Sequence, residues 1–229
     1  EDLRELAAMS VSFTRLFLLN GDPFILPAES LLHIADLVHY YLPHVNTITC
    51  YCSIRDLKRK SPTDLRNLRV NGFNELYIGL ETGYERALEQ MDKGCTVEDE
   101  WEMLACLKMS DFDYHAIIMD GIAGRGNTDE NVHATAALLN AYKPASIALM
   151  STTVMPGSRL ERMRDAGEFE EMTEREKLEE EIALLEALRM EDHCLFFADH
   201  AFSKAPVRGY FRDKERIIAY LRQVLSTLG

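Results

Sequence analysis

The repeating unit of this chain is clearest at residues 75–83, Glu-Leu-Tyr-Ile-Gly-Leu-Glu-Thr-Gly, a largely apolar strand pattern that ends in a polar break containing glycine. A short apolar strand pattern also runs into a polar break at four other places, which are Asn20-Gly21-Asp22-Pro23, Cys52-Ser53, Asp120-Gly121 and Met155-Pro156-Gly157. Each break opens toward a segment with helical periodicity. Repeated strand–helix units with polar residues at the carboxyl ends of the strands are typical of parallel barrels and open α/β sheets, which build one composite site there.

Hydrophobic periodicity predicts strands at 15–19, 45–51, 75–80, 114–119 and 146–150, with a short one at 195–198. Helices are predicted to begin near Pro27, Ser61, Thr96 and Thr128, and after Gly83. A long amphipathic helix through Leu178 to Leu188 and a last helix through Ile217 to Leu225 follow. About six strands are too few for a closed eight-stranded barrel, so we expect an α/β fold with a parallel sheet, a partial (β/α)6 TIM-like barrel, as one domain over residues 1–229.

The composition narrows the function classes. The net charge is −13, with 38 acidic and 25 basic residues, which disfavours binding to nucleic acid or to an anionic membrane, although local basic grooves remain compatible with it. The acidic excess lies largely in 168–181, where we expect the solvated face of a helix. No apolar run approaches the roughly 20 residues that span a bilayer, so we expect a cytoplasmic location. The five cysteines are expected to be reduced thiols.

Two carboxylates follow predicted strands directly. Asp22 lies beside Gly21, whose bare backbone lets a ligand approach, and its carboxylate suits an ammonium group; an ordinary turn is the alternative. Glu81 follows a strand that Gly79 interrupts, and its carboxylate suits ribose hydroxyls; an acid at the start of a helix is the alternative.

Other motifs are less specific. The glycines of 121–126 have the spacing G-x-x-G-x-G, which differs from the dinucleotide fingerprint, so we expect a strand-to-helix loop in which Arg125 meets an anionic substrate group. Cys50 and Cys52 share a strand face, but nothing completes a zinc set around them, and structural thiols are expected. His200 follows the last strand, where it either faces substrate or makes loop hydrogen bonds.

An ordered series of segments resembles one enzyme family. The segment 18–23 resembles the glycine-glycine-glutamate segment after the second strand of radical S-adenosylmethionine (SAM) enzymes. The segments 77–83 and 91–94 resemble their fourth strand and following helix, and 117–121 and 154–158 resemble their fifth and sixth strands. The branch is that of oxygen-independent coproporphyrinogen oxidase and Elongator-like proteins. The resemblance runs over nearly the whole chain.

The resemblance implies a partial six-stranded barrel, a [4Fe–4S] cluster and bound SAM. An electron from the cluster, supplied by a donor such as flavodoxin or ferredoxin, would cleave SAM to methionine and a deoxyadenosyl radical, which abstracts hydrogen from an unknown substrate. By position, Asn20, Gly21 and Asp22 would hold the methionyl ammonium, and Ser53 and Glu81 would contact the ribose and polar rim. The remaining implied contacts are Ile118 and Asp120 beside adenine, and Arg125, Met155 and His200 toward substrate.

The chain departs from the family at its cluster loop. None of the five cysteines reproduces the C-x-x-x-C-x-x-C spacing, so we expect the first strand and the cluster cysteines to precede Glu1 and this chain alone to be inactive. No metal ligand and no catalytic residue is assigned within it. Two alternatives stay open: a cluster-free barrel that binds a ligand or a protein partner, and an aldolase-like or hydrolytic barrel enzyme.

Overall fold

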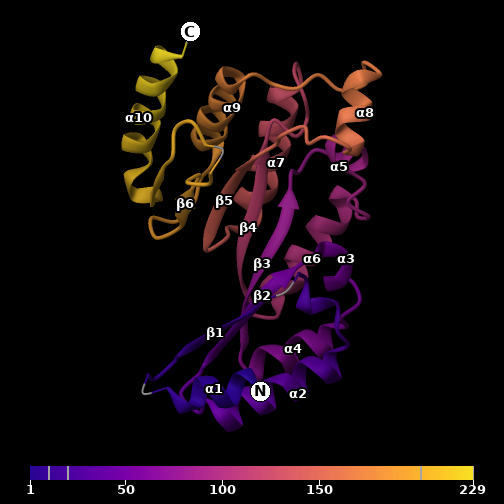
Figure 1. Ribbon diagram of the computed structural model, residues 1–229, viewed down its shortest axis with the longest axis vertical. Helices are drawn as coiled ribbons and strands as arrows, with labels where there is room; N and C mark the ends of the chain where they lie inside the picture. The colour runs from indigo at the N-terminus through magenta and orange to yellow at the C-terminus, as the bar shows by residue number, and fades with distance from the viewer. Residues whose placement is uncertain (10, 20, 202, 229) are drawn as a thin grey trace. The chain divides into compact units, whose positions relative to one another are not determined.

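The computed structural model describes residues 1–9, 11–19, 21–201 and 203–228 (Figure 1). In these residues seven strands form one sheet in the order of the chain. The strands are β1 (Arg15–Leu18), β2 (Thr47–Cys52), β3 (Phe73–Glu81), β4 (Asp113–Asp120), β5 (Ser146–Ser151), β6 (Leu195–Phe197) and β7 (Arg208–Tyr210). β1 pairs parallel with β2, β2 with β3 and β5 with β6, whereas β7 is antiparallel to β6. The predicted α/β class with a mostly parallel sheet is therefore confirmed, and β7 is an addition to it.

Helices connect the strands. Their bounds are α1 (Asp2–Ala8), α2 (Ala28–Tyr41), α3 (Ile54–Leu57), α4 (Pro62–Val70), α5 (Glu85–Met91), α6 (Val97–Met109), α7 (Thr128–Tyr142), α8 (Arg159–Asp165), α9 (Glu174–Ala187) and α10 (Lys214–Thr227), with 3-10 turns η1 (Pro23–Ile25) and η2 (Phe211–Asp213). The hydroxyl groups of Ser61 and Thr173 form capping boxes at the starts of α4 and α9, which satisfies backbone N–H groups that have no partner inside the helix. None of the helices in the described part of the chain is long and apolar enough to cross a membrane.

The chain divides into two compact units. The first contains residues 1–79 and 101–115, and the second contains 80–100 and 116–229. In the first unit, α2 packs against α1 and α4 and buries Leu31, Ala35 and Val38. The expectation of a single domain over residues 1–229 stays a prediction.

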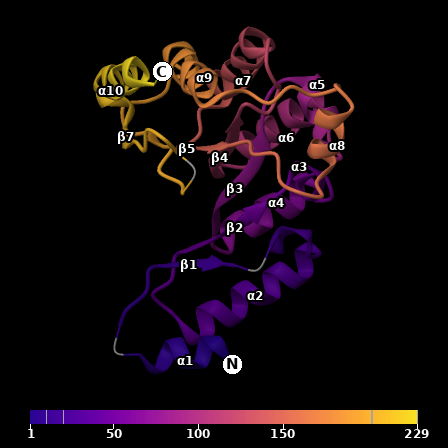
Figure 2. The same ribbon diagram turned by 45° about the horizontal axis from the view of Figure 1, so that its top comes forward.

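In the second unit, α9 lies between α7 and α10 and packs against both (Figure 2). β4 buries Ala116, Ile118 and Asp120 in alternation, as the period of a strand requires. The loop after β3 runs close to α7, because a Cβ atom on Gly83 would lie 2.7 Å from the carbonyl oxygen of Ala134. Only glycine fits this approach without displacing the helix backbone.

Candidate functional site

Asp22 follows β1 and caps the turn η1. Its Oδ1 accepts a hydrogen bond from the N–H of Phe24 at 3.1 Å, and its Oδ2 accepts one from the N–H of Ser53 at 2.8 Å. The second bond joins the polar segments that follow β1 and β2. Asp22 thus stabilises a turn, which was the alternative interpretation of this residue. An ionised carboxylate has about four acceptor positions, so some of them stay available for a ligand.

Ser53 begins α3. Its hydroxyl group donates to Asp56 Oδ2 at 2.7 Å and accepts from the N–H of Asp56 at 3.2 Å, so it acts as a helix cap. Gly21 is exposed and has a φ of 84°, and a Cβ atom there would meet no other atom within 4 Å. Asn20, which the resemblance assigns to the methionyl ammonium, lies outside the described residues.

Glu81 ends β3 in an unusual backbone conformation. Its φ is 67°, in the left-handed region that residues with a side chain rarely adopt and that is enriched at functional sites. Its Oε1 lies 2.6 Å from Nζ of Lys93, and the side chain of Glu81 is 16% exposed. The structure therefore places a carboxylate with a fixed cationic partner at the end of the strand.

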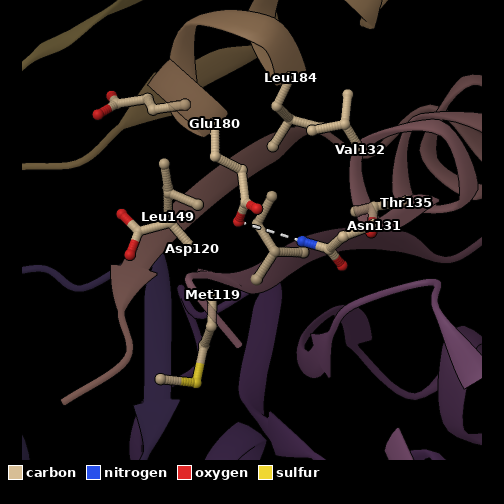
Figure 3. A pocket seen from close by; sticks show the side chains of 10 residues that line it. Met119, Asp120, Asn131, Val132, Thr135, Leu149, Glu180 and Leu184 are labelled. Carbon is tan, nitrogen blue, oxygen red and sulfur yellow. Dashed lines mark hydrogen bonds between the residues drawn. The ribbon is translucent and has the colours of Figure 1, made fainter. Parts of the chain in front are cut away.

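A buried polar network holds the loop that follows Glu81. The hydroxyl group of Thr82 donates to Asn131 Oδ1 at 2.5 Å. The side-chain amide of Asn131 donates in turn to Glu180 Oε1 at 3.2 Å, the bond drawn in Figure 3. The N–H of Gly121 donates to the same Glu180 oxygen at 2.9 Å. One chain of hydrogen bonds thus links the ends of β3 and β4 through α7 and α9, beside a cavity of about 10 Å³ that has room for one water molecule.

Asp120 ends β4 in buried surroundings. Burial raises the pKa of its carboxyl group to about 6. The Ser151 hydroxyl opposes this shift with one hydrogen bond shared between the two carboxyl oxygens, at 2.8 and 2.9 Å. Burial also raises the pKa of Glu180 to about 7. Burial, with a smaller contribution from the charge of Asp120, raises the pKa of Glu181 to about 8. The predicted solvated face over 168–181 is therefore wrong for Glu180 and Glu181, which are 2% and 5% exposed because α9 packs this side inward.

The residues expected toward substrate lie in the segments that follow three different strands. Arg125 pairs with Glu170 and lies 2.8 Å from Glu176 Oε1, and its hydrogen bonds hold the pKa of Glu176 down at about 2. Met155 is 56% exposed in the segment after β5. His200 is partly exposed after β6, where burial lowers its pKa. Ile118 is buried against the cavity beside α7 and α9.

The described residues do not fit an iron–sulfur cluster. They contain no group of three or more His, Cys, Asp or Glu side chains arranged to hold a metal ion. Cluster ligands are thiolates, yet burial raises the pKa of the thiols of Cys50 and Cys194 to about 12 and raises that of Cys52 well above its ordinary value. All five cysteines are free thiols, as expected from the sequence.

The sequence interpretation did not assign Lys93, Asn131 or Glu180 to the surroundings of Glu81. A signal for two of them was present. Asn131 interrupts the apolar face of α7 next to Val132. Glu180 and Glu181 lie among the apolar, inward-facing residues of α9, where burial of a polar group without a hydrogen-bond partner would lower stability.

No protein-family model matches the sequence, and no curated protein matches it significantly. Solved structures do match. Archaeal Elp3 of Methanocaldococcus infernus, with residues 1–46 deleted, superposes with a TM-score of 0.65 at 15% identity, over 91% of this chain and 54% of that one. Coproporphyrinogen III oxidase of Escherichia coli, a radical SAM enzyme, superposes with a TM-score of 0.60 at 16% identity, over 76% of this chain and 38% of that one.

A third match is the radical SAM methyltransferase TsrM of Kitasatospora setae, solved with cobalamin and a [4Fe–4S] cluster bound. Its TM-score is 0.55 at 15% identity, over 72% of this chain and 33% of that one. At these identities the matches establish the fold alone. The chain spans between a third and about half of the length of these three proteins.

Proposed function

Because this chain has the fold of the radical SAM enzymes, we propose that the protein containing it is such an enzyme and that this chain supplies part of its SAM pocket. The observation that carries the proposal is the superposition on 91% of the chain at a TM-score of 0.65. In the proposal, bound SAM supplies a deoxyadenosyl radical that removes hydrogen from a substrate whose identity stays open.

Asp22 has the chemistry to hold the methionyl ammonium of SAM. Two backbone N–H groups fix its carboxylate in place, so binding a cation there needs no reorganisation of the side chain. The acceptor positions that remain on the two oxygens suit an ammonium group, which carries three donors. Its shorter reach, compared with the glutamate usual in the family, is matched by the close approach that Gly21 permits.

Glu81 has the chemistry to accept hydrogen bonds from ribose hydroxyl groups. Lys93 and the network through Thr82 and Asn131 hold it in a backbone conformation that it would not adopt freely. Such positioning makes the carboxylate available without loss of side-chain entropy on binding.

The surroundings of Cys50 and Cys52 do not suit thiolates, so these cysteines are not the cluster ligands in this proposal. Cysteines elsewhere in the protein would bind the cluster. β1 is an edge strand of the described sheet, so its outer backbone groups are available to pair with a further strand.

The test uses the full-length protein, purified without oxygen and reconstituted with iron and sulfide. With SAM and dithionite it is expected to form 5′-deoxyadenosine. Asp22→Asn and Glu81→Gln should each lower that rate by about tenfold to a hundredfold, since a hydrogen bond to a charged group contributes about 1.5–3 kcal/mol. Asp36→Asn and Glu89→Gln are matched controls on exposed helix positions and should leave the rate unchanged.

A full-length protein that binds no stoichiometric iron and forms no deoxyadenosine would refute the proposal. The second candidate, a cluster-free ligand-binding module, would then be favoured. The observation in its support is that Asp22 and Arg125 are already engaged in hydrogen bonds within the chain, as they would be in a structural barrel.

A further inference from the structure

The carboxyl-terminal part of this acidic chain is locally basic. Residues 203–228 contain six basic and two acidic side chains, whereas the whole chain has a net charge of −13. Two of its arginines lie over aromatic rings: the guanidinium of Arg208 lies 4.6 Å from the ring centroid of Phe197, and that of Arg212 lies 4.9 Å from that of Tyr210. This segment is therefore more basic than the chain as a whole.

A groove of about 340 Å³ lies between β7 and α10 in this segment, and Figure 2 shows the two elements together. Its floor is apolar, with Val207 and Ile217 buried. A Cβ atom on Gly209 would lie 3.1 Å from Ile217 Cδ1, so the glycine lets α10 lie close against the strand. The lining consists of Pro206, Val207, Arg208, Arg216, Ile217 and Tyr220.

The two arginines of the groove differ in their partners. Arg208 lies 2.7 Å from Asp199 Oδ2, so its charge is already compensated. Arg216 is exposed and has no hydrogen-bond or ion-pair partner within 1–9, 11–19, 21–201 and 203–228. Tyr220 follows it by one helical turn on the same face of α10 and is 41% exposed. An uncompensated cation and an exposed aromatic ring thus border one groove.

We propose that this groove binds a nucleotide, with the phosphate at Arg216 and the base stacked on the ring of Tyr220. The volume falls within the range of small-molecule sites, roughly 300–1,000 Å³. Arginine recognises phosphate through paired donors, and aromatic side chains stack on any base. The source of the nucleotide is either a free mononucleotide or one residue of a single strand. The site shares no residue with those assigned to SAM and does not depend on the proposed radical chemistry.

The test measures binding of three probes to the full protein at 50 mM salt: inorganic phosphate, uridine 5′-monophosphate and fluorescein-labelled octauridylate. Uridine monophosphate should bind more tightly than phosphate, because the base adds stacking. Arg216→Ala should weaken both ligands by about tenfold and reduce the salt dependence of octauridylate binding by about one counterion. Tyr220→Ala should weaken uridine monophosphate binding by about fivefold to a hundredfold and leave phosphate binding unchanged.

Two further variants make these results specific. Arg222→Ala removes the same charge from another face of α10, where Arg222 pairs with Glu186, and should bind all probes as the wild type does. Tyr220→Phe keeps the ring and should bind normally, which separates stacking from any effect on folding. Octauridylate binding much tighter than the mononucleotide identifies a strand as the source, and equal binding identifies the free nucleotide. Binding of neither nucleotide probe, binding unaffected by Arg216→Ala or Tyr220→Ala, or an equal loss in Arg222→Ala would overturn the proposal.

Discussion

Glu100 is a carboxyl group in an unfavourable position, and its replacement should change how stability depends on pH. Its side chain is fully buried at the start of α6, and neither carboxyl oxygen has a hydrogen-bond partner among the described residues. Burial raises its pKa to about 9; Lys93 opposes this shift, and the nearby acids, first Glu85 and then Glu81, add to it. The folded protein therefore keeps this proton over most of the neutral range.

The size of the effect follows from the two pKa values. The unfolded chain loses the proton near the ordinary glutamate pKa of 4.5, and the folded chain loses it near a pKa of about 9. Between these values the folded state binds one more proton, so the free energy of unfolding falls by about 1.4 kcal/mol for each pH unit. From pH 5 to pH 8 this amounts to about 4 kcal/mol, a large part of the stability of an ordinary domain.

Glu100→Gln removes this titration. Between pH 5 and pH 8, the free energy of unfolding of the variant should fall by about 4 kcal/mol less than that of the wild type. Urea unfolding at four pH values measures this, followed by far-UV circular dichroism and by the fluorescence of Trp101, the only tryptophan of the chain. Glu102→Gln makes the same change at an exposed position of α6 and should follow the wild type. Equal losses for wild type and Glu100→Gln would show that Glu100 ionises normally in the folded protein.

Three further substitutions test the local structure without any cofactor. Asp22→Ala should lower the free energy of unfolding by about 1–3 kcal/mol in urea titrations, because the N–H of Ser53 loses its acceptor. An unchanged free energy of unfolding would show that this hydrogen bond does not stabilise the fold. Asn131→Ala should lower it by a similar amount and make its pH dependence steeper above pH 6, because Glu180 loses a donor; an unchanged pH profile would contradict the network. Gly83→Ala should lower the thermal midpoint by several degrees, since its Cβ would meet a backbone carbonyl of α7 at 2.7 Å, and a wild-type midpoint would mean that the loop moves aside.

Local sequence signals predicted the elements well where the physics is local. The cap at Ser61 and the proline that follows it determine the start of α4, because both act within one helical turn. Strands of five or more residues show their period in the sequence. β6 is equally short but wholly apolar and was predicted, whereas β7 is Arg-Gly-Tyr and has no apolar pattern. Its pairing with β6 depends instead on the close approach of α10 at Gly209.

The candidate site was less predictable because its contacts are long-range. That Glu81 ends a strand is visible in the sequence, but its ion pair with Lys93 depends on how α5 returns to the strand. Asn131 lies 49 residues from both of its side-chain partners in the network. An acidic run such as 168–181 cannot reveal which of its members face inward until the helix is packed.

The burial of Cys50 and Cys52 also provides a chemical probe of motion. Alkylating reagents attack the thiolate, and β2 keeps both thiols protonated and out of contact with solvent. Their modification in the folded protein therefore requires β2 to open. Mass spectrometry of the alkylated residues would thus report how often this strand opens, and comparison with the partly exposed Cys106 would separate that opening from the intrinsic reactivity of the reagent.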